Sequence, residues 1–334
     1  MKKEDLRIVF MGTPEFAVET LRMLVDSGYD VVAVVTQPDK PVGRHGSVLQ
    51  PSAVKQYALS VGLPVLQPEK MKDPVFVEQL RSYGANLQVV VAFRMLPEVV
   101  WAMPEYGTFN VHAALLPQYR GAAPINWAII NGETLTGVTT FFLDRDIDTG
   151  RIIEQMTFDI PADADAEYVY DGLMHLGATI CLSTIEKIIA SDGHPQSVSQ
   201  AEMTDAELKP APKLFKENCQ IDWNKTCKQV HDFVRGLSPY PGAWTTLAET
   251  GPGEDQARRD GPLTLKIYRT TCIQQRAETE GCVPGTIVAD KKHLYIACCD
   301  GLLQIDSLQL AGKKRMDAQA FLNGTKNVEK YSAR

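Results

Sequence analysis

The sequence predicts an α/β domain with a mostly parallel sheet, followed by a small OB-like β-barrel domain. Its 334 residues are enough for two domains of ordinary size. In the first third of the chain, apolar runs rich in β-branched residues alternate with segments of helical spacing, and strands separated by helices form parallel sheets. In the last third, short apolar runs are separated by Gly, Pro and Asp, which is typical of a small barrel.

Four buried strands and two helices are expected in the first domain. The strands are residues 7–11, 30–36, 87–92 and 108–112. One helix covers residues 14–27 and ends at Gly28, and the other, residues 163–190, is long and amphipathic and closes the domain. Ligands of such sheets bind beyond the carboxyl ends of the strands.

The polar segment 191–218, which contains three prolines and three lysines, is predicted to link the two domains. This places the first domain at residues 1–190 and the OB-like domain at residues 219–334. Residues 221–237 are expected to be helical. The short strands of the barrel are expected within residues 263–272, 285–290, 293–300 and 302–310.

The net charge of −7 is divided unevenly along the chain. Residues 1–207 carry −12 and residues 208–334 carry +5. Such a division suggests that the C-terminal part meets an anionic partner, and a nucleic acid would fit. The alternative is chance variation among solvated faces.

Composition argues against export, a membrane and a disulfide framework. No run of residues approaches the roughly 20 apolar residues that cross a bilayer, and the N-terminus has no apolar export core. The seven cysteines form no CxxC pair, so they are expected to be free thiols. We therefore expect a cytoplasmic protein with no membrane partner.

The stretch FMGTPEF, residues 10–16, is expected to turn from the first strand into the first helix. Gly12 ends the strand, Thr13 suits the N-cap and Pro14 suits the first helical position. The stretch is not GxGxxG, so it gives no support to a dinucleotide enzyme. It is either a structural turn or a place where exposed backbone N–H groups and Phe16 receive part of a substrate.

Asn110 and His112 are the first candidate pair for chemistry. Residues two apart on a strand share a face, so an amide donor and an imidazole converge at the strand's carboxyl end. A structural Asn–His pair that holds the following loop is the alternative. Arg120, in that loop, is equally consistent with a structural ion pair.

Asp148 is the third candidate, in LDRDIDTG after the expected strand GVTTFFL. The three alternating aspartates resemble a calcium loop, but Thr149 stands where that loop needs Gly, and no metal is expected. Asp148 is preferred because Gly150 allows a sharp turn beside it. Nucleophile, phosphate-loop and metal motifs are missing, which favours direct transfer between two bound substrates.

Several motifs together resemble the methionyl-tRNA formyltransferase family. They are RIVFMGTPEFAV, VTQPDKPVGR, NVHAALLPQYRGAAPIN, GVTTFFLDRDIDTG, IDW and SPYPGAW, in order from about Leu6 to beyond Lys313. The resemblance implies a Rossmann-like formyltransferase domain and an OB-like domain that contacts tRNA. It also implies 10-formyltetrahydrofolate as donor and the α-amino group of Met on initiator tRNA as acceptor.

The resemblance assigns roles to individual residues. The family's catalytic Asn, His and Asp fall on Asn110, His112 and Asp148. Its folate-contacting segments fall on Phe93, Arg94, Met95, Ala114, Leu115, Leu116 and Pro117, where Ala114 replaces the usual Ser and Phe93-Arg94-Met95 replaces a common Tyr-Gly. Together with the residues singled out above, the expected acceptor and tRNA contacts are Gly12, Thr13, Pro14, Phe16, Arg44, Lys209, Lys213 and Lys216; Lys313, Lys314 and Arg315 could join them.

Three other functions share parts of this pattern. A formyltransferase for a sugar or nucleotide amine would use the same Asn–His–Asp set, and a formyltetrahydrofolate hydrolase would use water as acceptor. An RNA- or folate-binding protein without activity is the non-enzyme alternative. We expect a monomer that uses direct transfer without a covalent intermediate.

Overall fold

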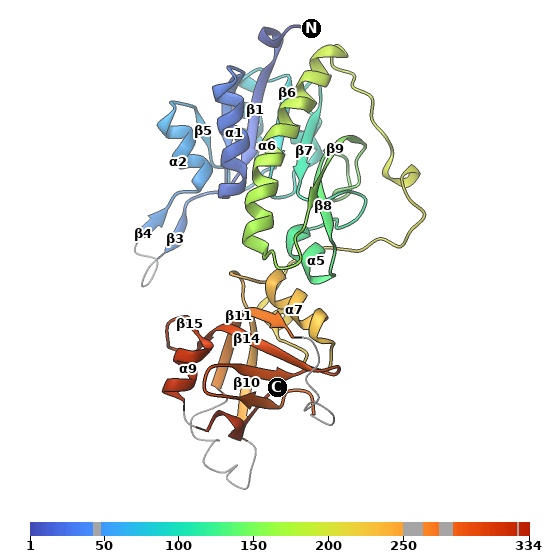
Figure 1. The fold of residues 1–334 in the computed structure, drawn as a ribbon. Coiled ribbons are helices and arrows are strands. Elements are labelled where there is room, and N and C mark those ends of the chain that lie inside the picture. Colours follow the sequence, from blue (N-terminus) through green and yellow to red (C-terminus); the bar gives the residue numbers. More distant parts are fainter. Residues whose placement is uncertain (43–47, 250–262, 274–282, 326) are drawn as a thin grey trace. The chain divides into compact units, whose positions relative to one another are not determined.

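The computed structural model describes residues 1–42, 48–249, 263–273, 283–325 and 327–334. The chain forms two compact units (Figure 1). Unit 1 comprises Met1–Pro124, Leu135–Asp159 and Tyr170–Ala211, and unit 2 comprises Ile125–Thr134, Ile160–Val169 and Pro212–Arg334. These limits differ from the division predicted at residues 190 and 218. Residues 191–211 pack within unit 1, and two short earlier segments pack within unit 2.

Unit 1 contains a seven-stranded sheet that confirms the predicted mostly parallel architecture. The first five strands in spatial order run parallel, the sixth runs in the opposite direction, and the seventh pairs antiparallel with the sixth. The last two were only partly predicted, because just residues 137–143 were expected to form a strand there. In spatial order the strands are β5 (Val65–Leu66), β2 (Asp30–Val35), β1 (Arg7–Gly12), β6 (Leu87–Val91), β7 (Thr108–His112), β8 (Leu135–Phe142) and β9 (Ile152–Asp159).

Helices cover both faces of this sheet (Figure 1). Alternate residues of a strand point to opposite faces, so Val9 and Met11 of β1 pack in a cluster with residues of α3 and α4. On the other face, Phe16 of α1 meets Tyr170 of α6 with ring centroids 5.2 Å apart. The helices are α1 (Glu15–Asp26), α2 (Ala53–Ser60), α3 (Pro74–Ser82), α4 (Glu98–Trp101) and α6 (Ala166–Ala190), and a hairpin of β3 (Lys40–Val42) and β4 (Val48–Gln50) precedes α2. Helix α5 (Pro124–Ile130) belongs to unit 2 except for its first residue.

Helix α6 corrects one expectation from composition. Among the described residues it is long and apolar enough to cross a membrane by length and composition. Its inner side contacts the sheet of unit 1: Thr184 Oγ1 lies 2.7 Å from Thr140 Oγ1, and a Cβ at Gly177 would lie 3.4 Å from Val111. The helix is apolar where it covers the sheet. It begins at Ala166 rather than residue 163, because the Asp165 carboxylate accepts the N–H of Tyr168.

Unit 2 is a nearly closed antiparallel barrel, as predicted. An isolated bridge between Thr286 and Ser332 joins the first and last strands of the sheet. Strand β10 was not predicted. In spatial order the strands are β12 (Ile287–Ala289), β13 (Leu294–Ala297), β14 (Leu302–Leu310), β11 (Leu263–Cys272), β10 (Ala243–Glu249) and β16 (Tyr331–Ala333), with β15 (Met316–Asp317) paired to β14; helices α7 (Cys227–Gly236) and α9 (Ala318–Gly324) complete the unit.

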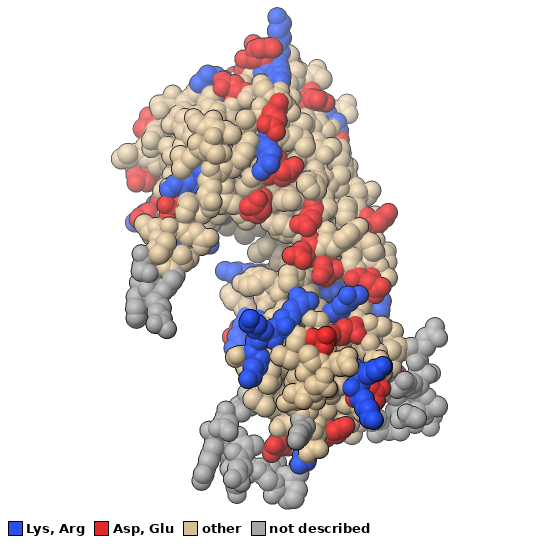
Figure 2. All heavy atoms as spheres, turned by 60° about the vertical axis from the view of Figure 1, so that its left-hand side comes forward, with Lys and Arg blue, Asp and Glu red and all other residues tan. Residues whose placement is uncertain are grey.

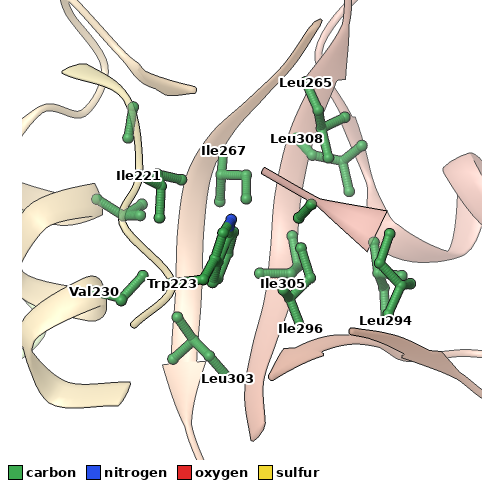
Figure 3. Packing of buried hydrophobic residues seen from close by; sticks show 14 of the residues in the cluster. Ile221, Trp223, Val230, Leu265, Ile267, Leu294, Ile296, Leu303, Ile305 and Leu308 are labelled. Atoms are coloured by element: carbon green, nitrogen blue, oxygen red, sulfur yellow. The ribbon is translucent and has the colours of Figure 1, made fainter. Parts of the chain in front are cut away.

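Trp223 lies in the core of unit 2, between Ile221 and Val230 on one side and strand residues on the other (Figure 3). Its indole N–H donates to Thr245 Oγ1 at 3.1 Å, so the buried ring leaves no unpaired donor. The helix α7 was predicted to begin at residue 221 but begins at Cys227, because this packing draws Trp223 into the core. The chain turns at residues 223–225, and Thr226 then caps the helix in a capping box.

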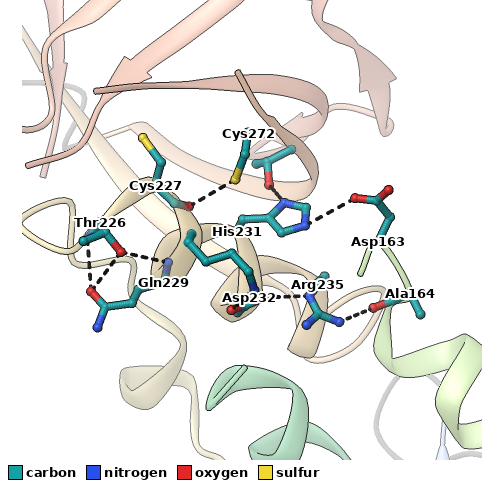
Figure 4. A network of polar contacts seen from close by, with 11 residues as sticks. Asp163, Ala164, Thr226, Cys227, Gln229, His231, Asp232, Arg235 and Cys272 are labelled. Carbon is teal, nitrogen blue, oxygen red and sulfur yellow. Dashed lines mark hydrogen bonds and ion pairs between the residues drawn. The ribbon is translucent and has the colours of Figure 1, made fainter. Parts of the chain in front are cut away.

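A polar network on α7 holds the segment before α6 within unit 2 (Figure 4). The buried Arg235 donates from Nη1 to Ala164 O and from Nε to Asp232 Oδ1, both at 2.8 Å. His231 Nδ1 lies 3.0 Å from Thr270 Oγ1, and Nε2 lies 3.7 Å from Asp163 Oδ1. Burial lowers the pKa of His231. These contacts place residues 160–169 with the barrel although α6 continues into unit 1.

Candidate active site

Strand β7 brings Asn110 and His112 to one face at the carboxyl end of the parallel strands. Asn110 pairs with Val90 of β6 and Phe141 of β8, and His112 pairs with Thr139 of β8. The hydrogen bonds between described residues do not use the Asn110 side chain, so its amide can serve a ligand. The structure thus places this pair as predicted.

The contacts of His112 fix which ring nitrogen faces the site. The side chain is only 6% exposed, and Nε2 lies 2.9 Å from Tyr119 O. Because a carbonyl oxygen only accepts, Nε2 carries the hydrogen and Nδ1 is the acceptor in the neutral ring. Nδ1 lies 3.9 Å from Asp148 Oδ2, which is beyond hydrogen-bond range but within that of an ion pair. Nδ1 is therefore the atom that can exchange a proton.

Asp148 lies in the β8–β9 loop in a left-handed conformation, with φ of 56°. This region costs most residues roughly 1–2 kcal/mol, and Asp adopts it more readily than most because its short polar side chain can accept hydrogen bonds. The Gly121 N–H donates to Asp148 Oδ2 at 3.0 Å. Gly150 was predicted to allow a sharp turn, but the residue with the left-handed conformation is Asp148. Gly150 is needed because a Cβ there would lie 1.7 Å from Phe142 O.

The predicted folate wall, Ala114 to Pro117, is held from beneath by β8 and β9. Thr139 Oγ1 donates to Ala114 O at 2.6 Å and accepts from Leu116 N at 3.1 Å. Gln155 Nε2 donates to Leu116 O at 2.8 Å. Several backbone groups of the wall therefore have partners within the protein. Leu115 is half-buried, whereas Ala114, Leu116 and Pro117 are buried.

Of the three predicted folate residues after β6, Met95 is the most open. It is 68% exposed. The Arg94 guanidinium donates to Pro68 O and Glu69 O, and burial lowers its pKa. It also lies 5.8 Å from the centre of the Phe93 ring. The Arg94 side chain thus holds a neighbouring loop, and Met95 is the side chain available to a ligand.

A pocket of about 370 Å³ opens beside Met95. Most of its wall is apolar, and cationic side chains stand among the apolar ones. Arg145 comes from the same loop as Asp148, so the pocket and the candidate catalytic group share a structural element. The lining residues are Met71, Lys72, Met95, Leu96, Pro97, Glu98, Trp101 and Arg145.

The turn after β1 differs from its prediction. The N-cap of α1 is Pro14, not Thr13, and Thr13 Oγ1 is buried without a hydrogen-bond partner among the described residues. The Phe16 ring is buried and its N–H donates to the Tyr170 hydroxyl at 2.8 Å. Gly12 is needed for packing, since a Cβ would lie 2.6 Å from the Cβ of Ala17. These contacts fit the first of the two interpretations of residues 10–16, in which the stretch is a structural turn between β1 and α1.

The predicted tRNA-binding lysines are exposed but belong to different units. Lys209 lies in unit 1, where its carbonyl accepts the Tyr119 N–H at 2.7 Å. Lys213 and Lys216 lie in unit 2, and Lys216 Nζ lies 5.9 Å from the centre of the Trp244 ring. Figure 2 shows Lys and Arg side chains gathered on one face of unit 2. Arg44 lies outside the described residues.

Sequence reasoning missed Thr139, Gln155 and Gln200, which support this site, and gave Arg120 a different structural role, an ion pair. Thr139 and Gln155 hold the folate wall, and Gln200 and Arg120 hold the Asp148 loop. Arg120 donates to the Gln200 side chain and makes no ion pair there. These residues lie far apart in sequence, so no local spacing signals them. Groups of three or more His, Cys, Asp or Glu suited to a metal do not occur among the described residues.

Comparison with known proteins defines the class. Residues 6–185 match the family model "Formyl transferase", and residues 213–326 match "Formyl transferase, C-terminal domain". The fold also resembles that of WlaRD, a sugar 3N-formyl transferase crystallised in the presence of dTDP and 5-N-formyl-THF. The TM-score is 0.61 at 18% identity, over 92% of this chain and 99% of that one. Fold and site together define a formyl-transferring enzyme.

Close relatives narrow the class to one family. A methionyl-tRNA formyltransferase of Parabacteroides distasonis is 58% identical, over 99% of both chains. That of Bacteroides fragilis is 53% identical, over 99% of this chain and 98% of its own. The chain belongs to the methionyl-tRNA formyltransferase family.

Proposed function

We infer that the chain transfers a formyl group from a folate to the α-amino group of methionine on initiator Met-tRNA, for the start of protein synthesis. The observation that carries this inference is the convergence of Asn110, His112 and Asp148 at the carboxyl end of β7. An amide donor can stabilise a developing oxyanion, and an imidazole and a carboxylate can move protons during formyl transfer to an amine. The family membership supplies the acceptor.

The proposed donor is 10-formyltetrahydrofolate, used without a metal ion. The pocket beside Met95 suits this molecule, because Leu96 and Trp101 offer apolar surface to a flat ring and Lys72 offers positive charge to a carboxylate. Arg145 Nη2 lies 3.5 Å from Glu98 Oε1, so its charge is shared with a carboxylate of the same pocket. The pocket shares the Asp148 loop, which would bring a bound formyl group toward the three candidate residues. The wall from Ala114 to Pro117 would complete the site.

Asn110, joined by His112 once Nδ1 has received the amine proton, would stabilise the negative charge that develops on the formyl oxygen as the amine attacks. The Asn110 NH₂ has its donors available, and one such donor typically contributes ~10²–10³ in rate. The β-sheet fixes the backbone of both residues, so little reorganisation is needed during the reaction.

Transfer moves one proton from the attacking amine to the departing N10 nitrogen. We propose that Asp148 takes the amine proton and passes it to His112 Nδ1, which then delivers it to N10. One proton thus moves from the amine to N10, and both side chains return to their starting states. The distance of 3.9 Å between Nδ1 and Asp148 Oδ2 leaves the two groups near enough to interact electrostatically. Because Nε2 is engaged by Tyr119 O, the transferred proton uses Nδ1.

Purified protein should formylate Met-tRNA when supplied with 10-formyltetrahydrofolate, and should leave free methionine and amino sugars unmodified. Mass spectrometry of the amino acid released from the tRNA detects the product. Initiator and elongator Met-tRNA are compared in parallel. Formylation of a small amine at an equal rate, or release of formate without acceptor, would contradict the proposed acceptor.

Lys213 and Lys216 are proposed to contact tRNA phosphates, with Lys209 and Arg44 also contributing. We expect the Lys213→Ala/Lys216→Ala variant to reduce the slope of log affinity against log salt by about 2, or roughly one per lost contact. Filter binding of Met-tRNA between about 50 and about 200 mM salt measures the slope.

Lys2→Ala serves as the control for this experiment. Lys2 is exposed and lies before β1, at the end of the sheet opposite to the candidate site. Its replacement should leave the slope unchanged. An unchanged slope in the double variant would exclude both lysines from the phosphate contacts.

We further propose that the protein acts as a cytoplasmic monomer without a membrane partner.

A further inference from the structure

The side chain of Gln200 is buried and fully engaged, although it lies outside the strands and loops that carry the candidate catalytic residues. It is 3% exposed. Its Nε2 donates to Asp148 O at 2.9 Å and to Gly150 O at 2.8 Å. Its Oε1 accepts from Arg120, from Nε at 2.9 Å and from Nη2 at 2.6 Å. Both ends of one carboxamide thus join two loops of the site.

These contacts close a ring around Asp148. Gln200 holds the Asp148 backbone on one side, and the N–H of Gly121 holds its carboxylate on the other. Arg120, the neighbour of Gly121, returns to Gln200. The backbone of Val198 exchanges two hydrogen bonds of 2.8 Å with Ile152, which anchors the ring to the start of β9.

The conformation of Asp148 explains why such a ring is needed. A φ of 56° is uncommon for residues other than Gly, and Asp adopts it when hydrogen bonds hold it there. If its carbonyl were released, the loop would be free to relax toward a right-handed conformation and carry the carboxylate away from His112. Only a carboxamide offers two donors and an acceptor from one planar group, so a carboxylate or a cation cannot replace it.

We propose that Gln200 is a positioning residue for formyl transfer: it holds the Asp148 loop in the left-handed turn that faces the carboxylate toward His112. This role rests on the proposed function, because Gln200 would affect formyl transfer only through Asp148. A shift of about 1 Å in a catalytic group can lower a rate ~10²-fold. The effect should fall on kcat, because Gln200 is buried beneath the loop and has no surface to offer either substrate.

Gln200→Glu is the most informative variant, because it keeps the shape and the acceptor for Arg120 but turns an oxygen toward the carbonyls of Asp148 and Gly150. We expect kcat to fall about 10- to 100-fold, with KM for Met-tRNA and for the folate within about three-fold of the wild-type values. Gln79→Glu, the same change at an exposed position on α3, should leave kcat close to that of the wild type.

The decisive measurement is the effect of Gln200→Glu in an Asp148→Asn background, by single-turnover formylation. If Gln200 acts through Asp148, the second replacement should change the rate less than about two-fold. An equal loss in both backgrounds would overturn the positioning role and indicate general structural damage. Should Gln200→Glu not fold, Arg120→Met replaces it in the same cycle; it removes the other end of the ring and leaves the Gln200 donors in place.

Failure of the positioning role is distinguishable from failure of the proposed function. A wild-type enzyme that formylates no Met-tRNA refutes the function itself. A wild-type enzyme that does so, with folded Gln200→Glu equally fast, refutes only the role of Gln200. Thermal unfolding of every variant shows which of them are folded.

Discussion

Replacing Asp148 with Asn is expected to lower kcat for formyl transfer by about 10²–10⁴-fold, the range associated with a positioned acid or base. Asn keeps an oxygen to accept the Gly121 N–H and retains the size of the side chain, so the loop should keep its conformation. What it loses is the negative charge 3.9 Å from His112 Nδ1. Single-turnover formylation of Met-tRNA measures the loss.

Asp146→Asn is the matched control, because it makes the same change two residues away in the same loop. The Asp146 side chain is exposed, and the hydrogen bonds recorded for this residue use its backbone. Its replacement should leave kcat within about two-fold of the wild-type value. If both variants lost activity equally, the effect would come from the charge of the loop and not from a specific carboxylate.

Asn110→Ala is expected to lower kcat by about 10²–10³-fold, because it removes a donor to the developing oxyanion. Asn110→Asp should be at least as damaging, since it places a negative charge where the formyl oxygen gains its own. Neither change disturbs a hydrogen bond of the folded protein among the described residues. Steady-state kinetics with Met-tRNA measure both, and KM should change little.

Stability and binding measurements separate chemistry from folding for Asn110. The side chain is half-buried on β7, so the free energy of unfolding should fall by no more than about 1 kcal/mol in Asn110→Ala. Folate affinity, followed by fluorescence quenching, should stay near the wild-type value. A variant that folds and binds folate but keeps normal turnover would remove Asn110 from the mechanism.

Much of the fold could be predicted from local patterns. The runs at residues 7–11 and 87–92 are continuous and β-branched, and they form neighbouring parallel strands. Predictions failed where tertiary contacts decide the local structure. Trp223 is drawn into the barrel core, so α7 starts later than its pattern suggested, and the start of α6 is held in unit 2 by Arg235.

The sequence was enough to predict which side chains form the candidate site, but not the hydrogen bonds that hold them in place. Alternation along one strand is enough to place Asn110 and His112 on a shared face. The approach of Asp148 depends on hydrogen bonds to Gly121 and Gln200, which are 27 and 52 residues away in sequence. Such pairings follow from chain topology, so a single sequence does not reveal them. The roles of all three groups in catalysis stay predictions.

The packing of residues 191–211 within unit 1 bears on how modular this enzyme is. Ala211 N donates to Arg120 O, and Ala211 O accepts from Ala123 N, so this segment borders the loop beside the active site. A chimaera that exchanges C-terminal domains between relatives should therefore be joined after Ala211. A junction at residue 190 would take this segment from one relative and the loop it contacts from the other, so the contacts that hold the candidate active site would join two different sequences.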